Sequence, residues 1–220
     1  MIAIRALRYR WPRAAADVLA IDELDIAAGE AVFLHGPSGC GKSTLLGLLA
    51  GVMLAREGSV RVMGQDWATL SGARRDAARA DHLGYIFQQF NLLPYLSVLD
   101  NVRLPCRFSK ARAARAPAGA AEALLGRVGL PTALWAKPAA ELSVGQQQRV
   151  AAARALIGAP PVVIADEPTS ALDAPLRDGF MDLLLGAVRE HGTTLVFVSH
   201  DERLAARFDR RLSLPELNRA

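Results

Sequence analysis

The chain has 220 residues, 51% of them hydrophobic and 22% charged, and a formal net charge of +4. This length suits one domain with a small inserted lobe, and the hydrophobic content is ample for a core. No apolar run approaches the roughly 18 to 20 residues that a bilayer-spanning helix needs, and the first residues lack the pattern of a secretion signal. We therefore expect a cytoplasmic chain.

The cysteines, histidines and arginines argue against several other classes of protein. Cys40 and Cys106 cannot make a disulfide framework, so a reducing compartment is indicated. The histidines show no metal-ligand spacing, and no structural metal is expected. The arginines are spread over the chain without an aromatic-interleaved basic run, so we expect no nucleic acid partner despite a pI near 9.5.

The first half of the chain alternates strand and helix patterns. Alternating or continuous apolar runs predict strands at 2–8, 18–26, 31–34, 58–63 and 83–87. Helical patterns run from 42 to 50, ahead of Gly51, and from 71 to 81. The first strands come without helices between them, which predicts a partly antiparallel N-terminal part.

The second half begins with helix signals alone. These lie at 97–102, around 109–115, and at 117–128, where Pro117 stands near the start and Gly129 just after the end. Strand patterns return at 162–165 and 193–198, with an amphipathic helix at 176–189 between them. Buried β-branched runs that alternate with helices predict a parallel sheet covered on both faces.

Together with the glycine-rich stretch at 36–44, which lies between the strand at 31–34 and the end of the helix at 50, these elements predict an α/β fold of the P-loop NTPase kind. It has a parallel sheet flanked by helices, an N-terminal antiparallel β subdomain and an inserted α-helical lobe. Within a single domain of residues 1–220, we assign 1–87 and 154–220 to the nucleotide-binding core with its β subdomain. Residues 88–153 form the helical lobe.

One stretch between a predicted strand and a predicted helix fits the phosphate-loop pattern G-x-x-x-x-G-K-[ST]. It consists of Gly36, Pro37, Ser38, Gly39, Cys40, Gly41, Lys42, Ser43 and Thr44. Its glycines let backbone N–H groups turn toward phosphate, and the helix N-terminus favours the same anion. Lys42 is expected to reach the β- and γ-phosphates and Ser43 to hold Mg²⁺. An ordinary glycine-rich turn is the alternative, but the spacing, the Lys-Ser pair and the flanking elements all agree with the motif.

Two carboxylates, Asp166 and Glu167, follow the predicted strand at 162–165. Ligands of open α/β sheets sit at the carboxyl ends of the strands. Asp166 is expected to bind Mg²⁺ through water, and Glu167 to orient and deprotonate the attacking water. Alone these residues could equally be a strand-terminal acidic turn. Together with the phosphate loop they favour ATP hydrolysis.

The segment Leu142–Arg149, Leu-Ser-Val-Gly-Gln-Gln-Gln-Arg, is a second specific signal. With it the chain resembles the nucleotide-binding subunits of ATP-binding cassette (ABC) transporters. The family's usual form is Leu-Ser-Gly-Gly-Gln, from which Val144 departs. If Ser143 is the N-cap and Gln146 the third helical residue, Ser-x-x-Gln is a capping box in which Val144 needs only an ordinary helical backbone. Gly145 is then the glycine expected close to phosphate.

The resemblance covers nearly the whole chain and implies further site residues. Gln88 matches the glutamine that contacts Mg²⁺ and couples to the partner, the segment 170–173 with Asp173 matches the D-loop, and His200 matches the histidine that contacts the γ-phosphate. Each match is weak when taken singly. Trp11 aligns with the aromatic residue that stacks on adenine in this family, and Tyr9 is the alternative candidate for this contact.

The resemblance also implies the assembly. ATP and Mg²⁺ would bind at two shared sites of a head-to-tail homodimer. One protomer would supply Lys42, Ser43, Gln88, Asp166, Glu167 and His200, and the other Ser143, Gly145 and Gln146. A lone chain cannot assemble such a site.

Residues 84–94 and 98–102 look like those of the branch that contains lipoprotein-releasing, macrolide-efflux and cell-division ATPases. Such subunits work with a separate transmembrane permease subunit at the inner face of the plasma membrane, here for export or for extraction of lipoproteins or lipids. An apolar cluster is expected to dock that subunit, or else to pack the helical lobe; it comprises Phe90, Leu92, Leu93, Pro94 and Tyr95.

Three other functions remain as rivals. A regulator of cell-wall enzymes could use the same ATP cycle to signal without moving a solute. A DNA-repair ATPase head is disfavoured because no long heptad segment interrupts the chain. A translation factor with tandem cassettes is disfavoured because each motif occurs once.

Overall fold

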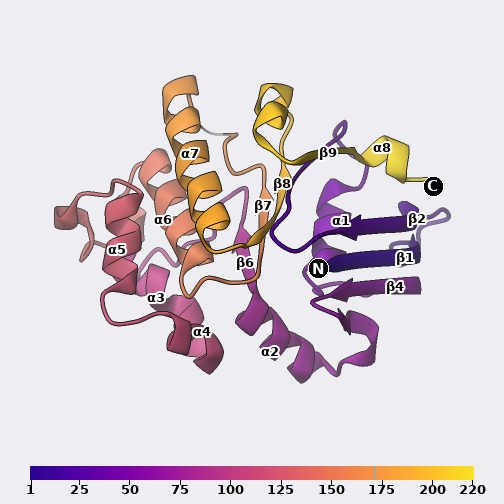
Figure 1. The fold of residues 1–220 in the computed structure, drawn as a ribbon, viewed down its shortest axis with the longest axis horizontal. Coiled ribbons are helices and arrows are strands. Elements are labelled where there is room, and N and C mark those ends of the chain that lie inside the picture. The colour runs from indigo at the N-terminus through magenta and orange to yellow at the C-terminus, as the bar shows by residue number, and fades with distance from the viewer. Residues whose placement is uncertain (171) are drawn as a thin grey trace.

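The computed structural model describes residues 1–170 and 172–220, and within them the strands form two sheets (Figure 1). The four-stranded sheet has the order β2-β1-β4-β5 and is antiparallel, and the five-stranded sheet has the order β6-β7-β8-β3-β9 and is parallel. The strands are β1 (Ile2–Tyr9), β2 (Leu19–Ile26), β3 (Ala31–His35), β4 (Glu57–Val62), β5 (Gln65–Asp66), β6 (Leu83–Ile86), β7 (Val162–Asp166), β8 (Thr194–Val198) and β9 (Arg210–Ser213).

The helices lie between and after these strands. They are α1 (Lys42–Leu49), α2 (Gly72–His82), α3 (Val98–Phe108), α4 (Lys110–Arg115), α5 (Ala120–Arg127), α6 (Val144–Leu156), α7 (Ala174–Glu190) and α8 (Leu214–Leu217). In Figure 1 the antiparallel sheet lies on the right, the helices α3 to α6 lie on the left, and strands of the parallel sheet run between them. The expected fold is therefore confirmed, with an antiparallel β sheet and a helical insertion between β6 and β7.

Alternate residues of strand β3, which lies between β8 and β9, face two different cores. Val32 and Leu34 pack with α1 and the antiparallel sheet, whereas Phe33 packs with buried residues of α6 and α7. Successive side chains of a strand point to opposite faces of its sheet, so a strand covered on both sides must be apolar throughout. The four residues Ala31 to Leu34 are all buried for this reason.

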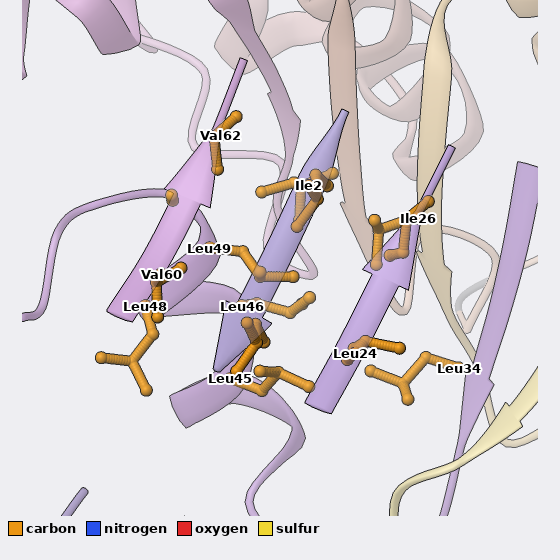
Figure 2. Close-up of a cluster of buried hydrophobic side chains, with 14 of the residues drawn as sticks. Ile2, Leu24, Ile26, Leu34, Leu45, Leu46, Leu48, Leu49, Val60 and Val62 are labelled. Atoms are coloured by element: carbon orange, nitrogen blue, oxygen red, sulfur yellow. The ribbon is translucent and has the colours of Figure 1, made fainter. Parts of the chain in front are cut away.

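Helix α1 joins the phosphate loop to the antiparallel sheet. Its leucines Leu45, Leu46, Leu48 and Leu49 are at most 1% exposed. Figure 2 shows these side chains between α1 and the residues of β1 and β4, among them Ile2 and Val60. Burial of one such side chain contributes about 1.5 to 3 kcal/mol, so this contact fixes the helix that follows the loop.

Two helix boundaries differ from the prediction. Helix α3 continues past Val102 to Phe108 with Pro105 inside it, because Leu99 and Cys106 pack on the core of the helical segment and this contact offsets the lost backbone hydrogen bond. Pro117 is not in a helix. Helix α5 begins after Gly119, whose φ of 83° lies in the left-handed region and separates Pro117 from the first helical turn.

The prediction also missed the strand β9, which pairs with β3 at the edge of the parallel sheet. Its sequence, Arg210-Arg211-Leu212-Ser213, carries two charges and lacks the apolar run of a buried strand. Edge strands tolerate such charges because one side of the strand has no neighbour.

Candidate nucleotide-binding site

The loop between β3 and α1 has the backbone that a phosphate site requires. Gly39 and Gly41 have φ values of 81° and 103°, in the region that favours glycine. A Cβ on Gly41 would also lie 2.9 Å from Cδ2 of Leu19, so a side chain there would clash. Gly41 caps α1 without a side-chain hydrogen bond. The first N–H groups of α1 therefore have no side-chain cap and can receive an anion.

Lys42 places a positive charge at the mouth of this loop. Its Nζ donates to the carbonyl oxygens of Gly36 and Pro37 at 2.8 and 2.9 Å. The residue is only 8% exposed, although its hydrogen bonds within the described chain go to carbonyl oxygens and not to a carboxylate. A buried ammonium next to an uncapped helix N-terminus fits a phosphate group.

The loop forms one wall of a cleft of about 460 Å³. Its lining is Trp11, Val18, Ser38, Gly39, Gly41, Lys42, Ser43, Thr44, Gln88, Asp166, Glu167 and His200. Residues from five separate parts of the sequence thus meet around one cavity. Gly36, Pro37 and Cys40 do not line it, and the first two serve through the carbonyl groups that hold Lys42.

Asp166 and Glu167 lie at the end of β7, as expected. Burial raises the pKa of both carboxyl groups, an effect that Lys42 opposes at Asp166 and that His200 and Lys42 oppose at Glu167. Glu167 has a φ of 48°, and its N–H donates to the carbonyl oxygen of Val198 at 3.0 Å. Its backbone is thus held in an uncommon conformation that aims the side chain into the cleft.

His200 lies against Glu167. Its Nε2 is 2.8 Å from Oε1 of Glu167, although the two atoms are not aligned for a full hydrogen bond. The imidazole is 51% exposed, whereas the Glu167 side chain is 11% exposed. The carboxylate is therefore shielded, and the imidazole forms the open side of the pair.

The two candidate aromatic residues occupy different places. Trp11 is 45% exposed and lines the cleft, whereas Tyr9 is 8% exposed and belongs to the core. The rings meet edge to face with centroids 5.4 Å apart, and the Tyr9 hydroxyl contacts Sδ of Met53 at 3.4 Å. Of the two, only Trp11 is open to a ligand in the cleft, and Tyr9 packs against it.

Val18 is a cleft residue that the sequence did not single out. It comes directly before β2, and its Cγ1 would lie 3.5 Å from a Cβ on Gly41. Nothing but its place at the start of a strand distinguishes it in the sequence. Its apolar side chain adds to the wall on which Trp11 lies.

The start of α6 confirms the capping box. The Ser143 Oγ accepts the backbone N–H of Gln146, and Oε1 of Gln146 accepts the backbone N–H of Ser143 at 3.0 Å. Val144 is helical and 51% exposed, so it tolerates the position as expected. Among the residues that the structure describes, a Cβ on Gly145 would meet only Leu172 and Leu176, at 3.7 and 3.9 Å. Nothing in the described chain thus requires glycine at this position.

Ser143, Gly145 and Gln146 are absent from the described lining of the cleft, and so is Asp173. Asp173 caps α7 by accepting the N–H of Leu176 at 3.0 Å. Of the expected D-loop, Ala171 lies outside the described residues. The structure therefore gathers one group of the predicted residues in the cleft and leaves the segment Leu142–Arg149, the signature segment, apart from it.

The expected docking cluster is only partly at the surface. Phe90 is 8% exposed and packs in the core with α6 and α7, so the prediction is wrong for this residue. Its carbonyl also accepts a bond from Nη2 of Arg154, and the Asn91 carbonyl accepts one from Nη1 at 2.6 Å. Leu92 is partly buried between two cores, and Tyr95 is 75% exposed.

The loop geometry, the buried lysine and the strand-end carboxylates together define a nucleoside triphosphatase of the phosphate-loop class. The family profile described as "ABC transporter" matches residues 19–170. This chain belongs to that family and is an ATP hydrolase that binds ATP.

Several relatives are similar over most of the chain. An "Uncharacterized ABC transporter ATP-binding protein YbbA" from Escherichia coli is 47% identical over 192 residues, covering 87% of this chain and 83% of that protein. The lipoprotein-releasing system ATP-binding protein LolD of Novosphingobium aromaticivorans is 42% identical and covers 98% and 96%. The macrolide export ATP-binding/permease protein MacB of Rhodopseudomonas palustris is 41% identical over 97% of this chain and 32% of its own length.

Among solved structures, the dimeric ATP-binding cassette MJ0796 in a post-hydrolysis state bound to ADP and Pi is 35% identical. It matches with a TM-score of 0.84 and covers 97% of this chain and 94% of its own. Within the described residues, no helix is both long and apolar enough to cross a membrane.

Proposed function

We propose that this chain is the ATP-hydrolysing subunit of a membrane transporter, working as a head-to-tail homodimer at the inner face of the plasma membrane. The observation that carries this is the separation of the predicted residues into two groups. The cleft holds the phosphate loop, Asp166, Glu167 and His200, whereas Ser143 and Gly145 start a helix outside it. The dimeric MJ0796 cassette, which is similar over 97% of the chain, supports a second copy as the source of the missing group.

Each cleft residue then has a distinct role. The Lys42 ammonium and the N–H groups of α1 bind the phosphates, and the exposed face of Trp11 stacks on adenine. Glu167 accepts the proton of the attacking water, and its raised pKa makes it a better base than an exposed glutamate would be. His200 holds the γ-phosphate from the open side of the cleft.

The cleft also fits Mg²⁺. Ser43, Gln88 and Asp166 all line it and carry the oxygen ligands that this ion prefers. The ion would neutralise charge on the phosphates when bound. We assign Asp166 to Mg²⁺ through water, because a bound cation would offset the burial that raises the pKa of this carboxyl group.

We assign the docking of the permease subunit to an apolar groove rather than to the cluster at Phe90. The groove has a volume of about 490 Å³, and its apolar lining includes Val52, Leu83, Tyr85, Phe87, Pro105 and Phe108. Phe108 is 73% exposed and Phe87, next to Gln88, is 37% exposed. Exposed aromatic residues around an apolar groove are typical of a protein interface, and Gln88 joins this groove to the nucleotide cleft.

The names of the similar proteins favour export or extraction of lipoproteins or lipids over signalling alone, since LolD is named for lipoprotein release and MacB for macrolide export. The test is to purify the chain with its membrane partner and to compare Phe108→Ser with Tyr95→Ser. Both residues are exposed, but only Phe108 lines the groove. Phe108→Ser should keep its basal ATPase and lose the partner's effect on turnover, while Tyr95→Ser keeps both. If Phe108→Ser keeps the partner's effect on turnover, the groove is not the interface.

A further inference from the structure

The loop that carries His200 is fixed through the next residue, Asp201. The Asp201 N–H donates to Oγ of Ser199 at 3.0 Å, so the backbone on both sides of His200 is tied together. The Asp201 carboxylate also caps the short helix η4 (Glu202–Arg207) by accepting the N–H of Arg203. The position of this carboxylate therefore determines where the His200 backbone lies.

Arg177 binds the same carboxylate from a different element. Its Nη1 donates to Oδ2 of Asp201 at 2.7 Å, and the two side chains are only 14% and 20% exposed. Arg177 lies in the first turn of α7, and its backbone N–H donates to the carbonyl oxygen of Asp173 at 2.9 Å. The pair thus links the start of α7, next to the expected D-loop, to the residue beside His200.

Two other ion pairs of this region provide a contrast. Arg203 also binds the Asp201 carboxylate, at 2.7 Å, but it belongs to η4 itself and cannot tie η4 to another element. Arg207, the last residue of η4, pairs with Asp182 of α7 and so joins the same two elements at the end away from His200. The side chains of Arg203 and Asp182 are 76% and 75% exposed. Exposed pairs of this kind contribute little.

We propose that Arg177 is a positioning residue that acts through Asp201 and holds the His200 imidazole beside Glu167. This inference rests on the catalytic role proposed for His200. Arg203 and Arg177 keep the pKa of the Asp201 carboxyl below its usual range, so the carboxylate is charged at neutral pH and the pair persists there. Arg177 does not line the cleft among the described residues. Its loss should therefore change turnover and leave ATP binding nearly unchanged.

The test compares the kinetics of Arg177→Gln with those of Arg203→Gln and Arg207→Gln, with His200→Ala as the reference. A shift of about 1 Å in a catalytic group can cost up to about 100-fold in rate. We expect Arg177→Gln to lower kcat by at least about tenfold with the ATP KM within about twofold of the wild type. Arg177→Lys should recover most of the rate, and the two control variants should match the wild type.

The outcomes separate this inference from the proposed function. If His200→Ala is inactive while Arg177→Gln turns over like Arg207→Gln, the positioning role is wrong and the function of His200 stands. If His200→Ala retains near wild-type turnover, both the catalytic role of His200 and the positioning role of Arg177 are wrong. A thermal melt accompanies each variant. An Arg177→Gln variant that melts far below Arg207→Gln and loses ATP affinity would show that Arg177 only stabilises the fold.

Discussion

The phosphate-loop cleft and the start of α6 are both rich in predicted site residues, but they differ in what holds them. In the cleft, Lys42, Glu167 and His200 depend on one another, through the burial of the carboxylate and the 2.8 Å contact with the imidazole. At the start of α6, Ser143 and Gln146 satisfy each other in a capping box without reference to the cleft. Contacts within the chain explain why the cleft needs its residues. At the start of α6, such contacts explain Ser143 but not Gly145, because the described residues around Gly145 leave room for a Cβ.

The difference teaches that the described part of this chain gives no reason for a glycine at position 145, so the proposed shared site must supply that reason. A position that tolerates a Cβ in its own protomer, yet is expected next to phosphate, is one where a partner's nucleotide makes the close approach. The predictions below test whether the two regions are halves of one site, beginning with the largest expected effect.

The largest effect is expected in the cleft. Glu167→Gln keeps the size and the backbone of the residue and removes the base, so turnover should fall by about 10²- to 10⁴-fold while ATP affinity is retained. Steady-state ATPase and equilibrium nucleotide binding measure the two quantities. Glu190→Gln, at an exposed glutamate paired with Arg127, is the control and should behave as the wild type. A fully active Glu167→Gln would remove this residue from the mechanism.

At the start of α6 we expect a smaller but clear ranking. Ser143→Ala removes a helix cap worth about 0.5 to 2 kcal/mol and also the hydroxyl proposed to bind the partner's phosphate. Val144→Gly changes only an exposed helical residue. ATPase activity should therefore fall at least about tenfold for Ser143→Ala and change little for Val144→Gly. The opposite ranking would show that the account of Val144 is wrong.

The adenine contact should give a smaller effect still. An aromatic pair contributes about 0.5 to 1.5 kcal/mol beyond its buried area, so Trp11→Ala should raise the ATP KM by about 2- to 10-fold. Trp11→Phe should retain most of the affinity because it keeps a ring on the cleft wall. If Trp11→Ala binds ATP as tightly as Trp11→Phe does, adenine does not stack at this position.

The smallest effect concerns stability and pH. Burial raises the pKa of Glu167 in the folded protein, so ionisation of this group opposes folding. The contribution of Glu167 to the stability of the wild type should fall as the pH rises from the ordinary glutamate pKa through the raised one. Glu167→Gln cannot ionise and should melt at a higher temperature than the wild type at neutral pH, with the difference shrinking in acid. Melting curves across this range measure it, and a lower melting temperature at neutral pH would contradict the direction of the pKa shift.

Much of this architecture could be predicted from the sequence because local chemistry agreed with the tertiary structure. The glycines of the phosphate loop, the apolar run of β3 and the leucines of α1 each admit few alternatives. Helix α3 was predicted too short because Pro105 normally ends a helix, and only its packing against the helical core shows why it does not. Strand β9 was missed because its two arginines are acceptable only at a sheet edge.

In the candidate site, too, the features that depend on tertiary contacts could not be predicted from the sequence. That Phe90 is core and Phe108 is exposed could not be read from their sequence neighbourhoods, since both directly follow polar residues, Gln89 and Arg107. The bonds from Arg154 to the carbonyls of Phe90 and Asn91 join residues more than 60 positions apart. The link between Arg177 and Asp201 likewise depends on where α7 and η4 meet, 24 positions apart.

The composite site itself is tested most directly by mixing two inactive variants. Lys42→Ala disables the phosphate loop, and Gly145→Asp places a carboxylate where the partner's phosphate is expected, at a position where the described residues leave room for a Cβ. In a head-to-tail dimer of one copy of each, one site combines the intact loop of the second with the intact signature segment of the first. We predict that the mixture hydrolyses ATP although neither variant does so alone. A mixture as inactive as its components, with both variants folded and able to associate, would contradict the shared site.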